Sequence, residues 1–288
     1  MAEKQKETGA KTLVFSAGAK GGVGKSTMAI LLIEALREAG LRVSALEGDE
    51  HSPTLVRKYA GSEISVGEVD LAGLVDRTGS VAFAGAVRRL EGEWVVVNTP
   101  ASGARLFDEN PEILAAFGGY ELRAVWSLSV NADRSDGEME NDGILSSLDR
   151  GLLSALDPGR VTVVKQPFQL AYRGQKCWYD SLDGWFTSNG VKTLTVEKLH
   201  PSLVELLHRD KRSLPEIVTD LNQSDPLVGA SLQLFWHNAK TEMIDSILSG
   251  VKVNLSDGLK STKGRFFGRK EAVTVDAPVE DETGEVQS

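Results

Sequence analysis

The sequence predicts an α/β protein with a doubly wound, mostly parallel sheet. Two observations lead to this fold class. Short apolar runs, each long enough for one strand, recur along the chain and are separated by segments long enough for helices. A glycine-rich loop directly follows the first run and precedes a segment with helical periodicity. Strands that alternate with helices in this way form parallel sheets with helices on both faces.

The expected elements follow one another in a simple order. The first strand covers residues 12–15, before the glycine-rich loop. A helix is expected over residues 28–39, because leucines and isoleucines recur there with helical spacing and Gly40 ends the pattern. The remaining strands are expected over residues 42–46, 94–97, 122–130, 161–164 and 193–196. Residues 200–215 again show helical apolar spacing, which we interpret as core rather than as a groove for a partner.

The composition is that of a globular protein and limits the class. Of the 288 residues, 41% are hydrophobic and 25% are charged, which is enough for a full core. No apolar run approaches the roughly 18 residues that span a bilayer, and the polar N-terminus is no secretory signal. The lone Cys177 cannot form an internal disulfide and is interpreted as a packing residue. We therefore expect a cytoplasmic protein, with association with the nucleoid as an open variant.

Charge and domain organisation bear on possible nucleic-acid binding. The net charge of −9 argues against a surface that coats nucleic acid, although a local basic patch is compatible with it. We expect a flexible N-terminus over residues 1–11, too short for a helix-turn-helix domain, one domain over 12–250, and a tail over 251–288. The tail is basic over 257–270 and purely acidic over 271–288, a pattern typical of disorder.

The loop over residues 20–27 (K-G-G-V-G-K-S-T) is the strongest functional signal. Its glycines let successive backbone N–H groups point at one anion, and the dipole of the next helix adds positive potential. Lys25 is expected to reach the β- and γ-phosphates of a nucleotide, and the Ser26 hydroxyl to ligate Mg²⁺. A ligand-free turn is the alternative, which the strand–loop–helix context disfavours. The predicted phosphate-binding residues are Gly21, Gly22, Val23, Gly24, Lys25, Ser26 and Thr27.

The loop departs from the general G-x-x-x-x-G-K-[S/T] template at Ala19, and it carries a second lysine, Lys20. This K-G-G-x-G-K-[S/T] form resembles the deviant Walker A loop of the ParA/MinD family of P-loop ATPases. The resemblance implies a SIMIBI-type NTPase fold for residues 12–250 and binding of ATP with Mg²⁺. It also implies an ATP-dependent homodimer, in which Lys20 crosses the interface to contact the partner's nucleotide.

The end of the second strand resembles a further part of the family's nucleotide site. Glu47 and Asp49 stand where the family has D-x-D, whose second carboxylate orients the attacking water. The resemblance implies this role for Asp49, and an ordinary turn residue is the alternative. His51 is interpreted as a solvated turn residue, because the family uses no histidine there. The residues expected to act in catalysis are Lys20, Lys25 and Asp49.

Residues 94–100 (W-V-V-V-N-T-P) resemble the family's Walker B segment, which runs to D-T-P. Here Asn98 replaces the aspartate. An amide accepts a hydrogen bond from Mg²⁺-bound water but lacks the charge that makes the bond strong, so hydrolysis is expected to be slow. The predicted metal-site residues are Ser26, Asp49 and Asn98. Gln166 stands where the family has a base-reading asparagine and is the predicted adenine contact.

The resemblance implies an ATPase whose dimer positions, segregates or helps transfer a cargo, with plasmid DNA in partition or conjugation and mobilisation as the favoured cargo. Expected partners are a second copy of the chain, an activating partner or cargo-adaptor protein, and DNA bound without sequence specificity. Iron–sulfur relatives that carry the same loop are excluded, because one cysteine cannot supply two ligands.

Three other functions stay open. A nucleotide-binding scaffold that hydrolyses poorly follows from Asn98. A MinD-like membrane-associated ATPase follows from residues 263–269 (K-G-R-F-F-G-R), although the acidic stretch beyond them argues for a solvated tail. A ligase that resembles dethiobiotin synthetase would need a substrate pocket in place of the dimer contact of Lys20.

Overall fold

The protein is described here by a computed structural model. The described residues belong to one compact unit, Met1–Val253. They are residues 10–18, 20–71, 77–101, 106–107, 109–110, 112–128, 134–135, 138–139, 143–165, 178–197 and 199–248. Ala19, Gln166, Cys177 and the predicted tail lie outside the described residues, as does most of the predicted N-terminal segment. The predicted limits of the three parts of the chain stay predictions.

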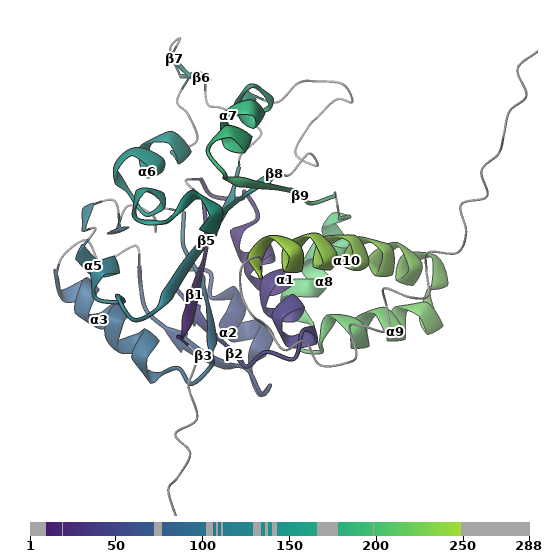
Figure 1. Cartoon of the computed structure of the whole chain (residues 1–288). Coiled ribbons are helices and arrows are strands. Elements are labelled where there is room, and N and C mark those ends of the chain that lie inside the picture. Colours follow the sequence, from purple (N-terminus) through teal and green to yellow (C-terminus); the bar gives the residue numbers. More distant parts are fainter. Residues whose placement is uncertain are drawn as a thin grey trace, which may run out of the picture. The chain divides into compact units, whose positions relative to one another are not determined.

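A seven-stranded sheet forms the centre of this unit, in the order β3-β2-β4-β1-β5-β8-β9 (Figure 1). Every pairing within it is parallel, which confirms the predicted sheet. Its strands are β1 (Thr12–Ala17), β2 (Val43–Glu47), β3 (Ser65–Glu68), β4 (Trp94–Asn98), β5 (Glu121–Ser127), β8 (Val161–Lys165) and β9 (Lys192–Thr195). A separate antiparallel pair joins β6 (Arg134–Ser135) to β7 (Glu138–Met139).

Helices cover both faces of the sheet, which confirms the doubly wound architecture (Figure 1). One layer contains α1 (Lys25–Glu38), α2 (Thr54–Tyr59), α8 (Pro201–Arg209), α9 (Leu214–Ser224) and α10 (Pro226–Ile247). The other contains α3 (Arg77–Arg89), α5 (Glu112–Ala115), α6 (Ile144–Arg150) and α7 (Asp183–Ser188), with the 3-10 turns η1 (Leu153–Ala155), η2 (Pro158–Arg160) and η4 (Trp178–Leu182) nearby. No helix in the described part of the chain is long and apolar enough to cross a membrane.

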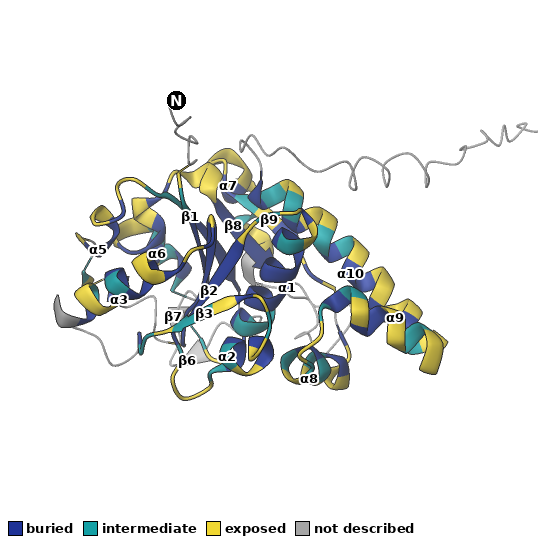
Figure 2. Ribbon diagram, turned by 90° about the horizontal axis from the view of Figure 1, so that it is seen from below, coloured by how far each residue is buried: buried dark blue, intermediate teal, exposed yellow. Residues whose placement is uncertain are grey.

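Each face of the sheet has its own packing, and the central strands β1, β2 and β4 between the two faces are buried (Figure 2). On the α3 and α5 side, alternate residues of β1, among them Phe15, point into an aromatic cluster. Phe107 lies between Phe15 and Phe83 with ring centroids 5.1 and 5.4 Å away, and Phe117 lies 5.4 Å from Phe83. These edge-to-face contacts anchor the side of the sheet opposite to α1.

The structure follows the predicted elements closely, with several differences. The strand expected over 122–130 ends at Ser127. The helix expected over 28–39 begins earlier, at Lys25, because the glycine-rich loop feeds directly into it. The edge strand β3 was not predicted, since its sequence S-V-G-E is short, polar and partly exposed. The segment over 200–215 forms two helices, α8 and α9, in which Leu203 and Leu207 are buried as expected for core.

Candidate functional site

The glycine-rich loop connects the carboxyl end of β1 to the start of α1. Gly22 and Gly24 have φ angles of +73° and +88°, a backbone conformation that side-chain-bearing residues rarely adopt. Gly24 is the N-cap of α1, and its carbonyl accepts the first helical hydrogen bond, from the Met28 N–H, at 2.8 Å. The loop therefore places the N-terminus of a 14-residue helix, with its positive dipole end, at this edge of the sheet.

Lys25 folds back over the loop. Its Nζ donates to the Lys20 carbonyl at 2.5 Å, and the residue is only 7% exposed. Ser16 of β1 fixes the backbone beneath it, because the Ser16 hydroxyl donates to the Lys25 carbonyl at 2.8 Å. The predicted phosphate-binding lysine is thus held inside the glycine-rich loop, next to the half-buried Lys20.

The strand register brings two polar residues together beside the loop. Asn98 is paired with Ser16 across β4 and β1, and with Glu47 across β4 and β2. The Asn98 Nδ2 donates to Glu47 Oε1 at 2.8 Å and to the Ser26 hydroxyl oxygen at 3.2 Å. A continuous chain of contacts therefore runs from the second strand through the fourth strand to the first turn of α1.

Glu47 is buried, with 2% of its surface exposed, and accepts three hydrogen bonds. Besides the Asn98 amide, the backbone N–H of Asp49 donates to Oε1 at 3.1 Å and that of Leu55 donates to Oε2 at 2.8 Å. Burial raises the pKa of the Glu47 carboxyl, and these three donors oppose the rise. Glu47 thereby ties the loop that carries Asp49 to the start of α2.

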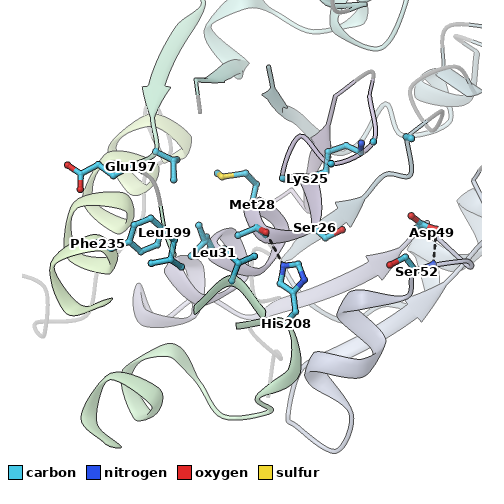
Figure 3. Close-up of a pocket in the computed structure, with 17 residues that line it drawn as sticks. Lys25, Ser26, Met28, Leu31, Asp49, Ser52, Glu197, Leu199, His208 and Phe235 are labelled. Carbon is cyan, nitrogen blue, oxygen red and sulfur yellow. Dashed lines mark hydrogen bonds between the residues drawn. The ribbon is translucent and has the colours of Figure 1, made fainter. Parts of the chain in front are cut away.

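The side chain of Asp49, the predicted catalytic carboxylate, does not take part in the hydrogen bonds between Glu47, Asn98 and Ser26. Its Oδ1 accepts a hydrogen bond from the Ser52 N–H at 3.0 Å, which stabilises the turn before α2 (Figure 3). Asp49 and Ser26 both line one cavity, whereas the chain of hydrogen bonds at Asn98 passes through Glu47. His51 is exposed in this turn, as expected for a solvated residue.

A cavity of about 440 Å³ opens beside the loop. Its polar end is formed by the glycine-rich loop, Asp49 and Ser52, and its other end is apolar (Figure 3). The apolar wall consists of Met28, Leu31, Val196, Leu199, Val204 and Phe235, contributed by α1, the β9–α8 connection, α8 and α10. Glu197 reaches the same rim, with its carboxylate turned away from Lys25 (Figure 3). A polar end and an apolar end suit a ligand with phosphate and ring portions.

Sequence reasoning missed His208, which the fold brings to this cavity. Its Nε2 lies 2.9 Å from the Thr27 hydroxyl oxygen, so α8 contacts the first turn of α1. Burial lowers the pKa of His208, and the charges of Arg57 and Lys58 on α2 lower it further. The two partners are 181 residues apart, and no local pattern in the sequence links them.

Oxygen atoms dominate the predicted metal site. Among the described residues, no group of three or more His, Cys, Asp or Glu side chains is arranged to hold a metal ion. Mg²⁺, however, is bound through one or two carboxylates, waters and substrate phosphates rather than by a full protein cage. Asn98 Oδ1 is a buried oxygen that has no hydrogen-bond partner within the described part of the chain, and the nitrogen of the same amide contacts the Ser26 hydroxyl at 3.2 Å. This donor set fits Mg²⁺ that arrives with a nucleotide.

Comparisons with known proteins concern the whole domain. The family model of the CobQ/CobB/MinD/ParA nucleotide binding domain matches residues 14–253. Apo McdA from Cyanthece superposes with a TM-score of 0.50 and 12% identity, over 82% of this chain and 99% of that one. The MinC:MinD cell division protein complex from Aquifex aeolicus gives a TM-score of 0.44 and 17% identity, over 86% and 98%. At 12% identity the McdA structure supports the fold alone. No curated protein matches the chain.

Proposed function

Because the chain belongs to the CobQ/CobB/MinD/ParA nucleotide-binding domain family, we propose that it is an ATPase that binds ATP with Mg²⁺ and dimerises through the bound nucleotide. The dimer positions, segregates or helps transfer a cargo, and plasmid DNA is the cargo we favour. An activating partner or cargo-adaptor protein would reset the cycle. ATP favours the dimer only as far as it binds the dimer better than the monomer.

This proposal is carried by the contact between Asn98, at the end of β4, and Ser26, at the end of the glycine-rich loop. The loop supplies backbone N–H groups and Lys25, and the Ser26 hydroxyl lies 3.2 Å from the Asn98 amide nitrogen. The apolar end of the adjoining cavity offers space for the nucleoside. A phosphate cradle, a metal-binding hydroxyl and a nucleoside compartment in one cavity are what ATP requires.

In the proposed cycle, Lys25 leaves the Lys20 carbonyl and bonds the β- and γ-phosphates. Ser26 would hold the metal, which neutralises the charge that develops on the phosphates. Asp49 would orient the attacking water after exchanging its contact with the Ser52 N–H. Lys20 would contact the nucleotide of the partner subunit. Gln166 remains the proposed adenine contact.

Slow hydrolysis is part of the proposal, because Asn98 brings no charge to the metal. A specific observation also favours a second function, a nucleotide-binding scaffold with negligible turnover. Asn98 is 0% exposed, and its amide nitrogen contacts both Glu47 and Ser26, so these contacts form without a carboxylate at position 98. Measured phosphate release separates the two functions.

The test combines light scattering with phosphate release in ADP, ATP without metal, and ATP with Mg²⁺. We expect the wild type to dimerise in ATP and Lys20→Ala to stay monomeric. Asp49→Ala is expected to remain a dimer in ATP, because without Asp49 the ATP is not hydrolysed and no phosphate is released. Lys211→Ala and Asp245→Ala, which alter exposed residues on the α8–α9 loop and α10, serve as matched controls. A wild type that is monomeric in every nucleotide would overturn the dimer, and tight binding without phosphate release would favour the scaffold.

DNA binding by the ATP-bound dimer is tested separately. Fluorescence anisotropy with a duplex of arbitrary sequence should show binding only in ATP and Mg²⁺. Affinity should fall steeply with salt concentration, because phosphate contacts release counterions. Equal binding in ADP and ATP would contradict a DNA-positioning switch.

A further inference from the structure

Glu47 and Asn98 are paired at the ends of neighbouring strands, and their buried side chains touch. We infer that the two act as one unit, in which Glu47 supplies the negative charge on the metal side of the site and Asn98 is the positioning residue. Asn98 joins this carboxylate to Ser26 through its amide nitrogen. The role of Glu47 at the metal rests on the proposed nucleotide site, whereas the contact between Glu47 and Asn98 does not depend on it.

The hydrogen bonds fix the orientation of the Asn98 amide. Glu47 Oε1 lies 2.8 Å from Nδ2, and an amide oxygen turned toward a carboxylate would be repelled. The amide nitrogen must therefore face Glu47, and the same nitrogen also reaches Ser26. Asn98 Oδ1 is consequently directed away from Glu47, as a buried acceptor without a partner among the described residues. A donor brought by the ligand, such as a metal-bound water, would satisfy it.

The surroundings of Glu47 match a carboxylate. All three groups that hydrogen-bond to its oxygens are N–H donors, from Asp49, Leu55 and Asn98. Glu47 and Asn98 are 2% and 0% exposed, so water does not screen a charge placed here. We therefore assign the negative charge near Ser26 to Glu47 at the end of β2. Asn98, at the end of β4, links Glu47 to Ser26 by hydrogen bonds.

A carboxylate at position 98 would not fit beside Glu47 without a cation. Two carboxylates at 2.8 Å, both buried, repel each other strongly. Asn98 removes this repulsion and replaces it with a charge-assisted hydrogen bond. The stability contributions of Glu47 and Asn98 are thus coupled, and Asn98→Asp alone should destabilise the protein. The loss of stability in Asn98→Asp should depend on the residue at position 47 and on the presence of Mg²⁺.

The first test is the melting temperature of the nucleotide-free protein. Asn98→Asp should lower Tm by about 4 °C or more. Mg²⁺ should recover part of the loss by bridging the carboxylates. Glu47→Gln combined with Asn98→Asp should recover at least half of it without Mg²⁺. Glu50→Gln combined with Asn98→Asp should recover nothing, because Glu50 is an exposed carboxylate nearby.

The same variants remain informative if Asn98→Asp does not fold. Soluble yield that returns with Glu47→Gln but not with Glu50→Gln supports the coupling. An equal loss in both double variants overturns it. An unchanged Tm of Asn98→Asp, or the same loss whether residue 47 is Glu or Gln, overturns it as well.

The second test measures the role of the Glu47 charge with a fluorescent ATP analogue. In Mg²⁺, Glu47→Gln should weaken binding about tenfold, whereas in EDTA the affinity should change little; a tenfold change corresponds to about 1.4 kcal/mol. Glu50→Gln should behave as the wild type in both. An equal loss in Mg²⁺ and EDTA would refute a metal-side role. If the wild type binds no nucleotide, the proposed function fails, and the Tm measurements still decide whether the two residues are coupled.

Discussion

Lys58 of α2 is a buried residue that contacts the loop between α8 and α9. It is 0% exposed, and its Nζ donates to the carbonyls of Asp210 at 2.6 Å and Arg212 at 2.8 Å. Burial lowers the pKa of Lys58, and the charges of Glu34 and Asp210 oppose this. The lysine thereby holds the α8–α9 loop against the helix that follows Asp49.

Replacing Lys58 tests this link. Lys58→Met should lower the free energy of unfolding by about 2 to 3 kcal/mol, because two carbonyls lose their donor. Chemical denaturation of the nucleotide-free protein measures the effect. Lys211→Met is the matched control, since Lys211 is exposed on the same loop. The link would be refuted if Lys58→Met and Lys211→Met lowered the free energy of unfolding by the same small amount.

His208 is a residue whose burial makes stability depend on pH. Burial, then Arg57 and Lys58, lower its pKa in the folded protein, while Thr27 bonds its Nε2. The unfolded chain therefore takes up the proton first, below about pH 6.5, and folding stability falls as pH drops until the folded-state pKa is passed. The charged neighbours on α8 itself, Glu205 and Arg209, pair with each other.

The comparison with His208→Gln isolates this contribution. Between pH 7 and pH 5 the wild type should lose more stability than the variant, as measured by urea unfolding at each pH. His51→Gln is the control, because His51 is exposed. Parallel pH profiles of the wild type and His208→Gln would show that His208 does not contribute.

At the scale of elements, the backbone of Gly24 decides how α1 begins. Its φ of +88° is left-handed, and α1 starts at the next residue. Gly24→Ala should destabilise the protein by about 1 to 2 kcal/mol, because a Cβ disfavours this conformation. Gly184→Ala should have the opposite sign, about 0.5 to 1 kcal/mol of stabilisation, since Gly184 lies in α7 with nothing within 4 Å of an added Cβ. Thermal unfolding of both variants checks the two signs, and destabilisation by both would contradict this explanation.

The elements also show what the sequence could predict. The strands β1, β2, β4, β5, β8 and β9 were predicted because each is an apolar run between polar segments, a local signal. The edge strand β3 carries no such run, because one side of it faces solvent. Likewise, Glu47 and Asn98 were each singled out at the end of a strand, whereas their direct hydrogen bond follows only from the register of β2 and β4.

At the scale of the whole molecule, the site depends on contacts between distant parts of the chain. The glycine-rich loop is contiguous in sequence and was predicted as such. The apolar wall of the cavity is not, because Phe235 and Leu199 come from elements near the other end of the domain. Helical spacing identifies these residues as buried, but it does not say that they face the first turn of α1. Only the packing of α8 and α10 against α1 determines that.

Ligand binding and dimerisation are separable by their effects on the stability of the whole molecule. ATP with Mg²⁺ at about a hundred times Kd should stabilise the fold by about 2.7 kcal/mol, or roughly 5 to 10 °C in Tm. Lys25→Met should abolish the shift. Lys20→Ala should keep a shift that no longer grows with protein concentration, because Tm depends on concentration only where folding is coupled to association. If the Tm of the wild type in ATP were also independent of concentration, the chain would bind its nucleotide as a monomer, and Lys20 would belong to its own subunit's site alone.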